Sequence, residues 1–313
     1  MESSRPIYAA LAEAFAAESV STIFTLMGDG NMHFMTAYRA LPDTKVISSR
    51  HEHGAVMMAV AYREATGKTG VASVTCGPGF TQIMTALTSA ARNHIPLVVF
   101  AGEAPMHAHW YTQAIDQAAL CTPTGAHYIA AHSPYRMHQC VREAFYVAAT
   151  ERNPVVIGVP YDLQKEDLPE QGAYQPSSTI IPQTGRPLPD PGQIHVAVQH
   201  LLAAKTPVII AGRGVLESGA EDLVRDLAAR TGAILSNTLI ARGLYDDHPY
   251  SINIAGGFTR ETGQAVAERA DFVLAFGASL THYTLEGGGL FPSAVLGRGG
   301  LDQRGYRAGR KAG

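Results

Sequence analysis

Two hydrophobic patterns alternate between Pro6 and Val159. Amphipathic stretches with helical spacing are followed by short apolar runs that are typical of strands. The predicted helices cover residues 8–18, 31–40, 55–62 and 80–92, and the predicted strands cover 21–26, 45–48, 70–75, 96–101 and 154–159. Because the apolar runs are nearly continuous, we expect a parallel sheet with helices on both faces, as in an α/β fold.

A proline-rich segment interrupts this alternation. Six of the 18 prolines fall between Lys165 and Gln193, so we expect a linker over 166–190. A second alternation follows, with predicted helices at 194–204, 220–231 and 261–270 and predicted strands at 207–211, 233–236 and 271–276. The predicted fold class is therefore α/β, with two doubly wound parallel-sheet domains over 1–165 and 191–294. Residues 295–313 are rich in Gly and Arg, and we expect a disordered tail there.

Composition limits the partners of the protein. A length of 313 residues fits two domains, and a formal net charge of −3 offers no basic field for nucleic acid or an anionic membrane. No apolar stretch approaches the roughly 20 residues that span a bilayer, and the first residues do not resemble a secretion signal. Three scattered cysteines fit a reducing compartment. We therefore expect a cytoplasmic protein with no nucleic-acid or membrane partner.

Glu52 is the first candidate for chemistry. It lies in the run RHEHGA (50–55), between a predicted strand and the most apolar predicted helix. The Ala, Val and Met side chains of that helix would desolvate the carboxyl group, which could then hold or donate a proton near neutral pH. The alternative is a Glu that only stabilises the helix N-terminus, and the residues alone leave both roles open.

Three glycine-containing turns are further candidates. TCGPG (75–79) lies between an apolar strand and a helix, where glycines let a ligand approach the backbone. GDGN (28–31) offers magnesium-type oxygen ligands, but no Asn follows at the needed spacing, so we predict a strand–helix turn with Asn31 as N-cap and no metal. AGRG (211–214) has no third glycine at the spacing of a dinucleotide fingerprint. An ordinary strand–helix turn would also explain each of them.

Taken in order, these segments resemble thiamin-diphosphate-dependent enzymes of the acetolactate synthase, benzoylformate decarboxylase and pyruvate decarboxylase superfamily. The resemblance runs from Pro6 to Ala294. It rests on six segments: F-x-x-x-G-x-G-N at 24–31, RHEHGA at 50–55, AYREATGKTGV at 61–71, TCGPG at 75–79, NHIPL at 93–97 and QAIDQ at 113–117. Their common order makes the set specific, although no single segment is. Gln82 departs from the pattern, because many members have Asn there.

The resemblance implies roles for individual residues. The N-terminal domain would bind the aminopyrimidine ring of thiamin diphosphate, and the second would be the central domain. Glu52 matches the glutamate that hydrogen-bonds ring nitrogen N1′ and thereby promotes loss of the proton from the thiazolium carbon C2. The cofactor-binding residues would be Gly28, Glu52, Thr75, Gly77, Pro78 and Gly79, and the substrate-side residues Asn31 and Gln113. The expected substrate is a 2-oxo acid such as pyruvate, which the family decarboxylates or joins to a second carbonyl compound.

One part of the family pattern is not recognised in this chain. The third domain of family members carries a G-D-G…N sequence that binds magnesium and the diphosphate. We therefore expect a C-terminally truncated member that binds the cofactor weakly and has little activity alone. Two alternatives are half of a split enzyme, completed by a separate chain, and a non-catalytic nucleotide-binding or regulatory module. By resemblance the protein would form homo-oligomers, and FAD in the central domain is an option that no residue supports.

Overall fold

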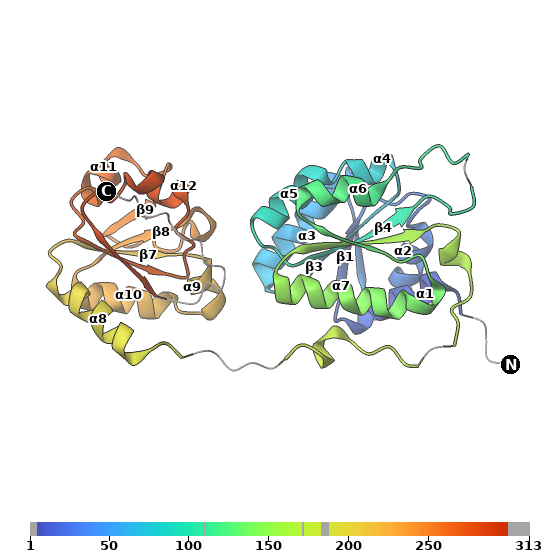
Figure 1. Cartoon of the computed structure of the whole chain (residues 1–313), viewed down its shortest axis with the longest axis horizontal. Coiled ribbons are helices and arrows are strands. Elements are labelled where there is room, and N and C mark those ends of the chain that lie inside the picture. Colours follow the sequence, from blue (N-terminus) through green and yellow to red (C-terminus); the bar gives the residue numbers. More distant parts are fainter. Residues whose placement is uncertain (1–4, 109, 171, 183–187, 300–313) are drawn as a thin grey trace. The chain divides into compact units, whose positions relative to one another are not determined.

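The chain forms two compact units, Met1–Thr184 and Gly185–Gly313, each built around one parallel sheet (Figure 1). A computed structural model describes residues 5–108, 110–170, 172–182 and 188–299. In each unit, two separate hydrophobic cores lie on the two faces of the sheet. The predicted fold class, α/β with two doubly wound parallel-sheet domains, is therefore confirmed.

The sheet of the first unit has the order β2-β1-β3-β4-β6-β5, and all of its pairings are parallel. Its strands are β1 (Thr22–Thr25), β2 (Lys45–Ser48), β3 (Gly70–Val74), β4 (Leu97–Glu103), β5 (His127–Ala130) and β6 (Pro154–Pro160). Its α-helices are α1 (Ile7–Ala17), α2 (Met32–Arg39), α3 (Glu52–Thr66), α4 (Pro78–Thr81), α5 (Met84–Arg92), α6 (Gln117–Cys121) and α7 (Met137–Glu151).

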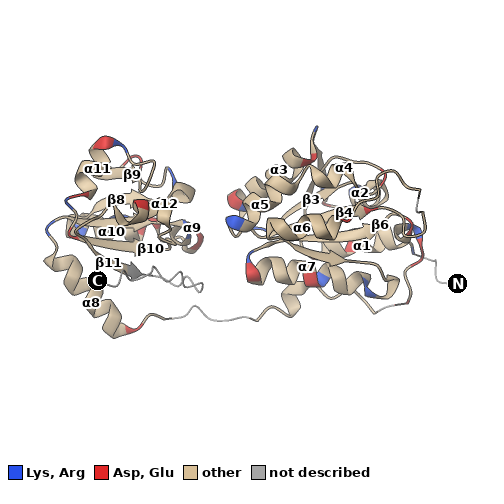
Figure 2. Cartoon of the chain, turned by 45° about the horizontal axis from the view of Figure 1, so that its top comes forward, with Lys and Arg blue, Asp and Glu red and all other residues tan. Residues whose placement is uncertain are grey.

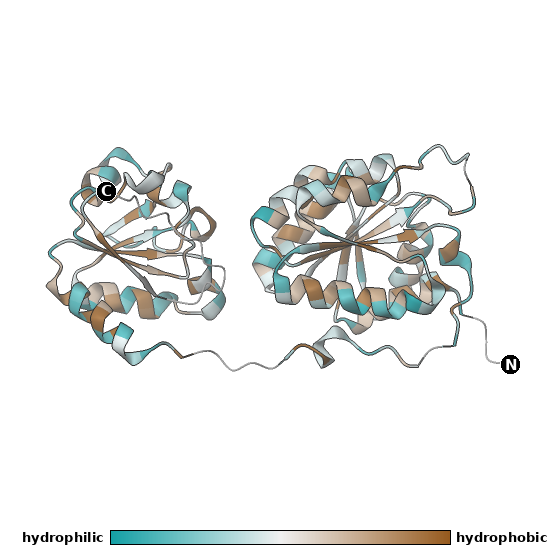
Figure 3. Cartoon of the chain, in the orientation of Figure 1, coloured by the Kyte–Doolittle hydropathy of each residue, from teal (hydrophilic) through white to brown (hydrophobic). Residues whose placement is uncertain are grey.

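Alternate side chains of the central strands fill the two cores of this unit. On β4, Val98 and Phe100 face α1, α2 and α7, whereas Leu97 and Val99 face α3 and α5. Phe34 of α2 stacks on Phe100 with the ring centroids 4.0 Å apart. Figure 3 shows the hydrophobic strands between the helical layers. The continuous apolar runs of the sequence are thus explained by burial on both faces.

The sheet of the second unit has the order β11-β10-β7-β8-β9 and is also parallel. Its strands are β7 (Pro207–Ala211), β8 (Ile234–Asn237), β9 (Ser251–Ile254), β10 (Phe272–Phe276) and β11 (Val295–Gly299). Its α-helices are α8 (Pro191–Ala203), α9 (Arg213–Ser218), α10 (Glu221–Thr231), α11 (Glu261–Ala267) and α12 (His282–Leu285).

Two expected elements are corrected by the structure. Residues 80–92, expected as one helix, belong to α4 and α5, because the N–H of Ile83 bonds to the carbonyl of Phe80 instead of continuing the α-helical pattern. The expected tail begins too early at Val295, since β11 pairs in parallel with β10. Backbone groups make this pairing, so a Gly- and Arg-rich sequence does not prevent it. Residues 300–313 of the expected tail lie outside the described residues.

The first part of the expected linker, 166–190, packs on the first unit. The carboxylate of Glu18 accepts hydrogen bonds from the hydroxyl of Tyr174 at 2.5 Å, the N–H of Ser177 at 2.7 Å and the Ser177 hydroxyl at 2.6 Å. Charge-assisted bonds of this kind are stronger than neutral ones, so they hold the segment as a strap. The first unit therefore extends past the expected boundary at residue 165, as far as Thr184.

Acidic and basic side chains are interspersed over the helices and loops of both units (Figure 2). The strands β3, β6 and β7 carry no charged residue. Across the described residues, we find no helix with the length and apolar character needed to cross a bilayer.

Candidate functional site

The order of the first sheet reverses between β1 and β3, since β2 lies on one side of β1 and β3 on the other. In open α/β sheets, ligands bind at such a switch point, beyond the carboxyl ends of the strands. Three turns begin there: residues 26–31 follow β1, residues 49–51 follow β2 and residues 75–77 follow β3. These turns, with the helix starts that they lead into, contain most of the predicted site residues.

Glu52 is the first residue of α3 and is half-buried. His51 fixes the start of this helix, because its Nδ1 accepts the N–H of His53 at 3.2 Å and its carbonyl accepts the N–H of Ala55 at 3.1 Å. Within the described ranges, the Glu52 carboxylate has neither a hydrogen bond nor an ion pair. The fold therefore positions this acid beside a helix N-terminus and leaves its oxygen atoms available to another group.

The TCGPG turn lies against this carboxylate. A Cβ atom on Gly79 would be 3.0 Å from Oε1 of Glu52 and 2.5 Å from Cγ2 of Thr75, so only glycine leaves room there. Gly77 has a φ of +59°, and a Cβ on it would collide with the carbonyl oxygen of Gln113. Pro78 opens α4 at its first position. The structure thus brings the predicted cofactor-binding residues of this turn to Glu52.

The turn after β1 joins the same group. The N–H of Gly30 donates to Oγ1 of Thr75 at 3.0 Å, and a Cβ on Gly28 would lie 2.8 Å from the Thr75 side chain. Gly30 also packs against the backbone of Gly102 at the end of β4. Gly28 is therefore in contact with the TCGPG turn.

Asn31 is the N-cap residue of α2, as expected, but its side chain does not cap the helix. Its side chain is completely buried, and its Nδ2 donates to Oγ of Ser73 at 2.9 Å and to Oγ1 of Thr25 at 3.2 Å. Its Oδ1 accepts the N–H of Gly28 at 2.9 Å, so the side chain makes no N-cap bond to α2. These contacts do not support a substrate-side role, because the Asn31 amide is fully engaged in hydrogen bonds that link the turn after β1 to β3.

Gln113 lies beside the turn and is half-buried. The thiol of Cys76 donates to its Oε1 at 3.3 Å, and the hydroxyl of Tyr111 is 3.8 Å from the same sulfur. Burial, followed by the hydrogen bond to Cys76, raises the pKa of Tyr111 well above its usual range. Tyr111 therefore remains a neutral donor at physiological pH.

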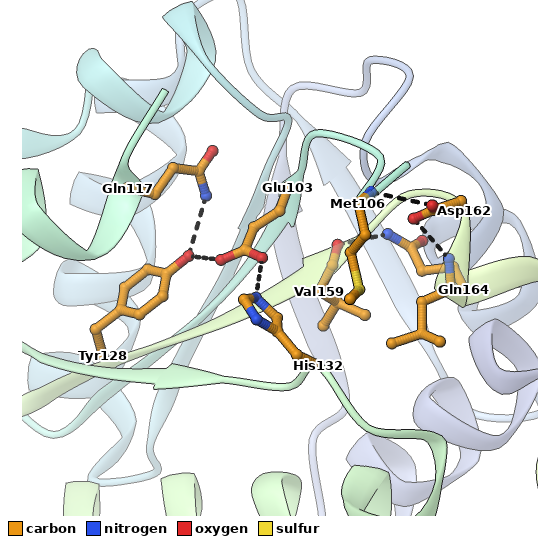
Figure 4. A network of polar contacts seen from close by, with 9 residues as sticks. Glu103, Met106, Gln117, Tyr128, His132, Val159, Asp162 and Gln164 are labelled. Atoms are coloured by element: carbon orange, nitrogen blue, oxygen red, sulfur yellow. Dashed lines mark hydrogen bonds and ion pairs between the residues drawn. The ribbon is translucent and has the colours of Figure 1, made fainter. Parts of the chain in front are cut away.

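A hydrogen-bonded chain behind the turn was not predicted from the sequence (Figure 4). Oε1 of Gln117 accepts the N–H of Gly77 at 3.1 Å, and Nε2 of Gln117 lies 3.3 Å from the hydroxyl of Tyr128. The same hydroxyl donates to Glu103, which also contacts His132. These residues come from α6, β5, the end of β4 and the loop after β5, and no local sequence signal marks contacts over such separations.

The AGRG turn of the second unit uses its glycines for internal packing. The N–H of Gly212 donates to the carbonyl of Phe276 at 2.8 Å, and the N–H of Gly214 donates to the carbonyl of Gly277 at 3.0 Å. A Cβ on either glycine would press on the backbone of Gly277. Both N–H groups are therefore engaged within the second unit.

Metal ligands are not clustered in the part of the chain that the structure describes. No three His, Cys, Asp or Glu side chains lie close enough there to hold a metal ion. In the GDGN turn, Asp29 is exposed, whereas Asn31 is buried with its amide engaged internally.

Two family models match the chain. The description "Thiamine pyrophosphate enzyme, N-terminal TPP binding domain" covers residues 6–120, and "Thiamine pyrophosphate enzyme, central domain" covers 194–295. Together they span more than half of the chain. The chain belongs to the thiamin-diphosphate-dependent enzyme superfamily. Glu52, the TCGPG turn beside it and the turn after β1 all lie within the first of these domains.

Curated relatives of this chain include both decarboxylases and carboligases. It is 31% identical over 280 residues to a probable 2-ketoarginine decarboxylase from Pseudomonas aeruginosa, covering 87% of this chain and 48% of the relative. It is 31% identical over 268 residues to glyoxylate carboligase from Escherichia coli (83% and 44%), and 31% identical over 271 residues to the large subunit of acetolactate synthase isozyme 2 from Escherichia coli (85% and 48%). The chain spans about half the length of these relatives.

Proposed function

We propose that this chain forms the pyrimidine-binding part of a thiamin-diphosphate-dependent enzyme that acts on 2-oxo acids, with Glu52 as its catalytic residue. The observation that carries the proposal is the Glu52 carboxylate, which is half-buried and placed against Gly79 without a partner among the described residues. A carboxylate held in this way is suited to accept a hydrogen bond from a protonated ring nitrogen.

The residues around Glu52 fit an aromatic ring that carries such a nitrogen. Gly28 and Gly79 have no side chains and their backbones pack closely on Thr75, so the two turns meet beside Glu52 without a bulky side chain at either glycine. When bound, thiamin diphosphate would supply a carbon nucleophile that attacks the carbonyl of a 2-oxo acid and accepts the electron pair released with carbon dioxide. The task of Glu52 would be to hold the proton at N1′ of the ring.

We base the proposed substrate class, 2-oxo acids, on the activities named for the relatives. A decarboxylase, a carboligase and an acetolactate synthase are among them, so pyruvate and glyoxylate are the 2-oxo acids to test first. We keep Gln113 as the proposed substrate-side residue, because it is half-buried beside the turn. Asn31 is withdrawn from that role, since its amide is buried and engaged. We assign binding of the diphosphate and Mg²⁺ to a third domain that is not recognised in this sequence and that a separate chain would supply.

Selective labelling of glycine tests this proposal. The sequence contains two Pro-Gly pairs, so ¹³C′-proline with ¹⁵N-glycine reports only on Gly79 and Gly192. With millimolar thiamin diphosphate and Mg²⁺, we expect the Gly79 signal to move, whereas Gly192 in the second unit stays as an internal control. Glu52→Gln should weaken binding at least tenfold, the change expected for loss of one charge-assisted hydrogen bond.

A matched variant on the same helix separates the site from general charge effects. Glu64 also lies on α3 but is exposed, so Glu64→Gln should bind the cofactor as the wild type does. A Gly79 signal that never moves, or a Glu52→Gln variant with unchanged affinity, would contradict the proposal. Carbon dioxide release from pyruvate and from glyoxylate by the assembled enzyme then identifies the preferred acid.

A further inference from the structure

Gln117 connects the cofactor turn to residues that the proposed mechanism does not use. It is 4% exposed, and its Oε1 accepts the N–H of Gly77 at 3.1 Å. Gly77 has a φ of +59°, which few residues other than glycine adopt, so its peptide depends on neighbouring contacts for its orientation. Gln117 is therefore one of the groups that hold the turn in the shape facing Glu52.

The direction of the hydrogen bonds behind Gln117 is set by charge. Glu103 is a carboxylate and can only accept, so the single hydroxyl proton of Tyr128 is donated to it. The Tyr128 oxygen must then accept from Nε2 of Gln117, 3.3 Å away. That leaves Oε1 of Gln117 as the atom that faces the N–H of Gly77. The charge on Glu103 thus determines which end of a distant amide meets the turn.

Packing holds the hydrogen-bonded side chains of Glu103, Tyr128 and Gln117 in place. The Glu103 side chain is 14% exposed, and a Cβ on Gly158 of β6 would collide with both Tyr128 and Glu103, so the glycine leaves the space that their contact occupies. Burial and the neighbouring Glu103 also raise the pKa of Tyr128 far above its usual range, which keeps its hydroxyl protonated as the donor. His132 contacts the other oxygen of Glu103 from a half-exposed position.

We propose that Glu103 is a positioning residue for cofactor binding, acting through Tyr128 and Gln117 on the Gly77 peptide. This inference rests on the proposed function, because the hydrogen-bonded series Glu103–Tyr128–Gln117 is proposed to serve the turn beside Glu52, where the cofactor would bind. Glu103→Gln removes the charge while keeping the shape of the side chain. With an amide at position 103, Tyr128 can donate to its oxygen as in the wild type or accept from its NH₂ group. In the second arrangement the Tyr128 hydroxyl donates to Gln117, whose NH₂ group then turns toward the N–H of Gly77.

The amide of Gly77 can be observed alone. The sequence contains a single Cys-Gly pair, so a full-length chain labelled with ¹³C′-cysteine and ¹⁵N-glycine gives one correlated signal, that of Gly77. We expect its hydrogen exchange to be roughly fivefold to tenfold faster in Glu103→Gln, as for the loss of one ordinary hydrogen bond. Tyr128→Phe should give a similar change, and it provides the same test if Glu103→Gln does not fold.

A double variant and a control make the test specific. If Glu103 acts through Tyr128, combining Glu103→Gln with Tyr128→Phe should have no larger effect on Gly77 than Tyr128→Phe alone. His132→Ala leaves the charge of Glu103 in place, so exchange at Gly77 should stay within twofold of the wild type. Unchanged exchange in Glu103→Gln, or fully additive effects in the double variant, would overturn the inference.

Cofactor titration of the same variants completes the test. Glu103→Gln should need roughly fivefold more thiamin diphosphate than the wild type to move the Gly79 signal by half, and an equal affinity would overturn the positioning role. Failure of the wild type to respond to cofactor would instead contradict the proposed function. The exchange of Gly77 is measured without cofactor, so the two failures can be told apart.

Discussion

The two units each place a glycine-rich turn after a buried parallel strand, yet the two turns differ in what they leave available. After β7, the N–H groups of Gly212 and Gly214 both bond to backbone carbonyls at the end of β10. After β3, the glycines of the TCGPG turn make room for the Glu52 carboxylate, which has no partner among the described residues. Glycines in a strand–helix turn therefore do not by themselves mark a ligand site, and our proposal for the first unit depends on the unpaired Glu52 carboxylate instead.

The first prediction compares alanine at one glycine of each turn. Gly77→Ala should destabilise the first unit by about 2–5 kcal/mol, because it adds a disfavoured positive φ to a collision with Gln113. Gly212→Ala should cost the second unit about 1–3 kcal/mol, since its φ of −112° suits alanine and only the collision of the new Cβ with the backbone of Gly277 and Ala278 opposes it. Urea unfolding followed by peptide-resolved hydrogen exchange measures the unfolding free energy of each unit separately. Equal losses of stability in the two variants would contradict the difference that we expect between the two glycines.

The second prediction concerns Asn31. Asn31→Ala should destabilise the first unit by about 2–4 kcal/mol, because the N–H of Gly28 and the hydroxyls of Thr25 and Ser73 lose buried partners. Asn31→Asp keeps the acceptor for Gly28 but replaces the donors by a buried, unpaired carboxylate, so its effect should be at least as large when both variants are unfolded in urea. A stable Asn31→Ala chain with altered substrate affinity would restore the substrate-side role that we withdrew.

The third prediction is a difference in acid sensitivity between the units. Burial, with a smaller effect of Lys165, lowers the pKa of His33 below its ordinary value of 6.5. The unfolded chain then binds this proton more tightly than the folded chain, so the stability that His33 contributes above pH 6.5 is lost as the pH falls below that value. Burial and nearby arginines lower the pKa of His138 in the same direction.

The stability of the second unit is expected to decrease only at a lower pH than that of the first unit. The N–H groups of Lys205 and Thr206 lower the pKa of Asp271 below 3.8, so the stability from this carboxylate is present above pH 3.8 and is lost below it. Between pH 7 and 5, hydrogen exchange should therefore accelerate more in the first unit than in the second. His33→Gln should reduce that difference, and an equal response of both units would contradict the assignment.

The smallest expected change in stability is at Glu52. Glu52→Gln should alter the unfolding free energy of the first unit by no more than about 0.5 kcal/mol, because the carboxylate has no partner among the residues that the structure describes and gains only a modest helix-terminus interaction. Thermal unfolding measures this. A small change in stability together with the weaker cofactor binding expected above would indicate that Glu52 serves the chemistry and not the fold. A large loss of stability would favour the alternative, in which Glu52 only stabilises the helix N-terminus.

Much of the fold could be predicted from hydrophobic pattern. The strands at 45–48 and 207–211 were predicted with the same bounds as β2 and β7, because their neighbours include clear turn residues. The helix α7 was missed, although Met137, Val141 and Ala144 recur at helical spacing in its buried face. The edge strand β5 gave a weaker signal, since none of its four residues is fully buried.

The site was predicted only as far as local segments allow. Glu52, Gly28 and the TCGPG turn could be selected because each lies in a short recognisable run. The roles of Asn31 and Gln117 could not, because they depend on which side chains meet across strands. Gln117 and Tyr128 are separated by 11 residues and Tyr128 and Glu103 by 25, so only the folded sheet brings the three together.

The contact between Gln164 and Gly30 has a consequence for how the protein is made. The Nε2 atom of Gln164 donates to the carbonyl of Gly30 at 2.8 Å, across 134 positions of sequence. During translation, the turn after β1 can therefore form this hydrogen bond only after nearly the whole first unit has emerged from the ribosome. A gene broken between these two codons would oblige its products to recover the bond by association, whereas a break after residue 184 would leave it within one polypeptide.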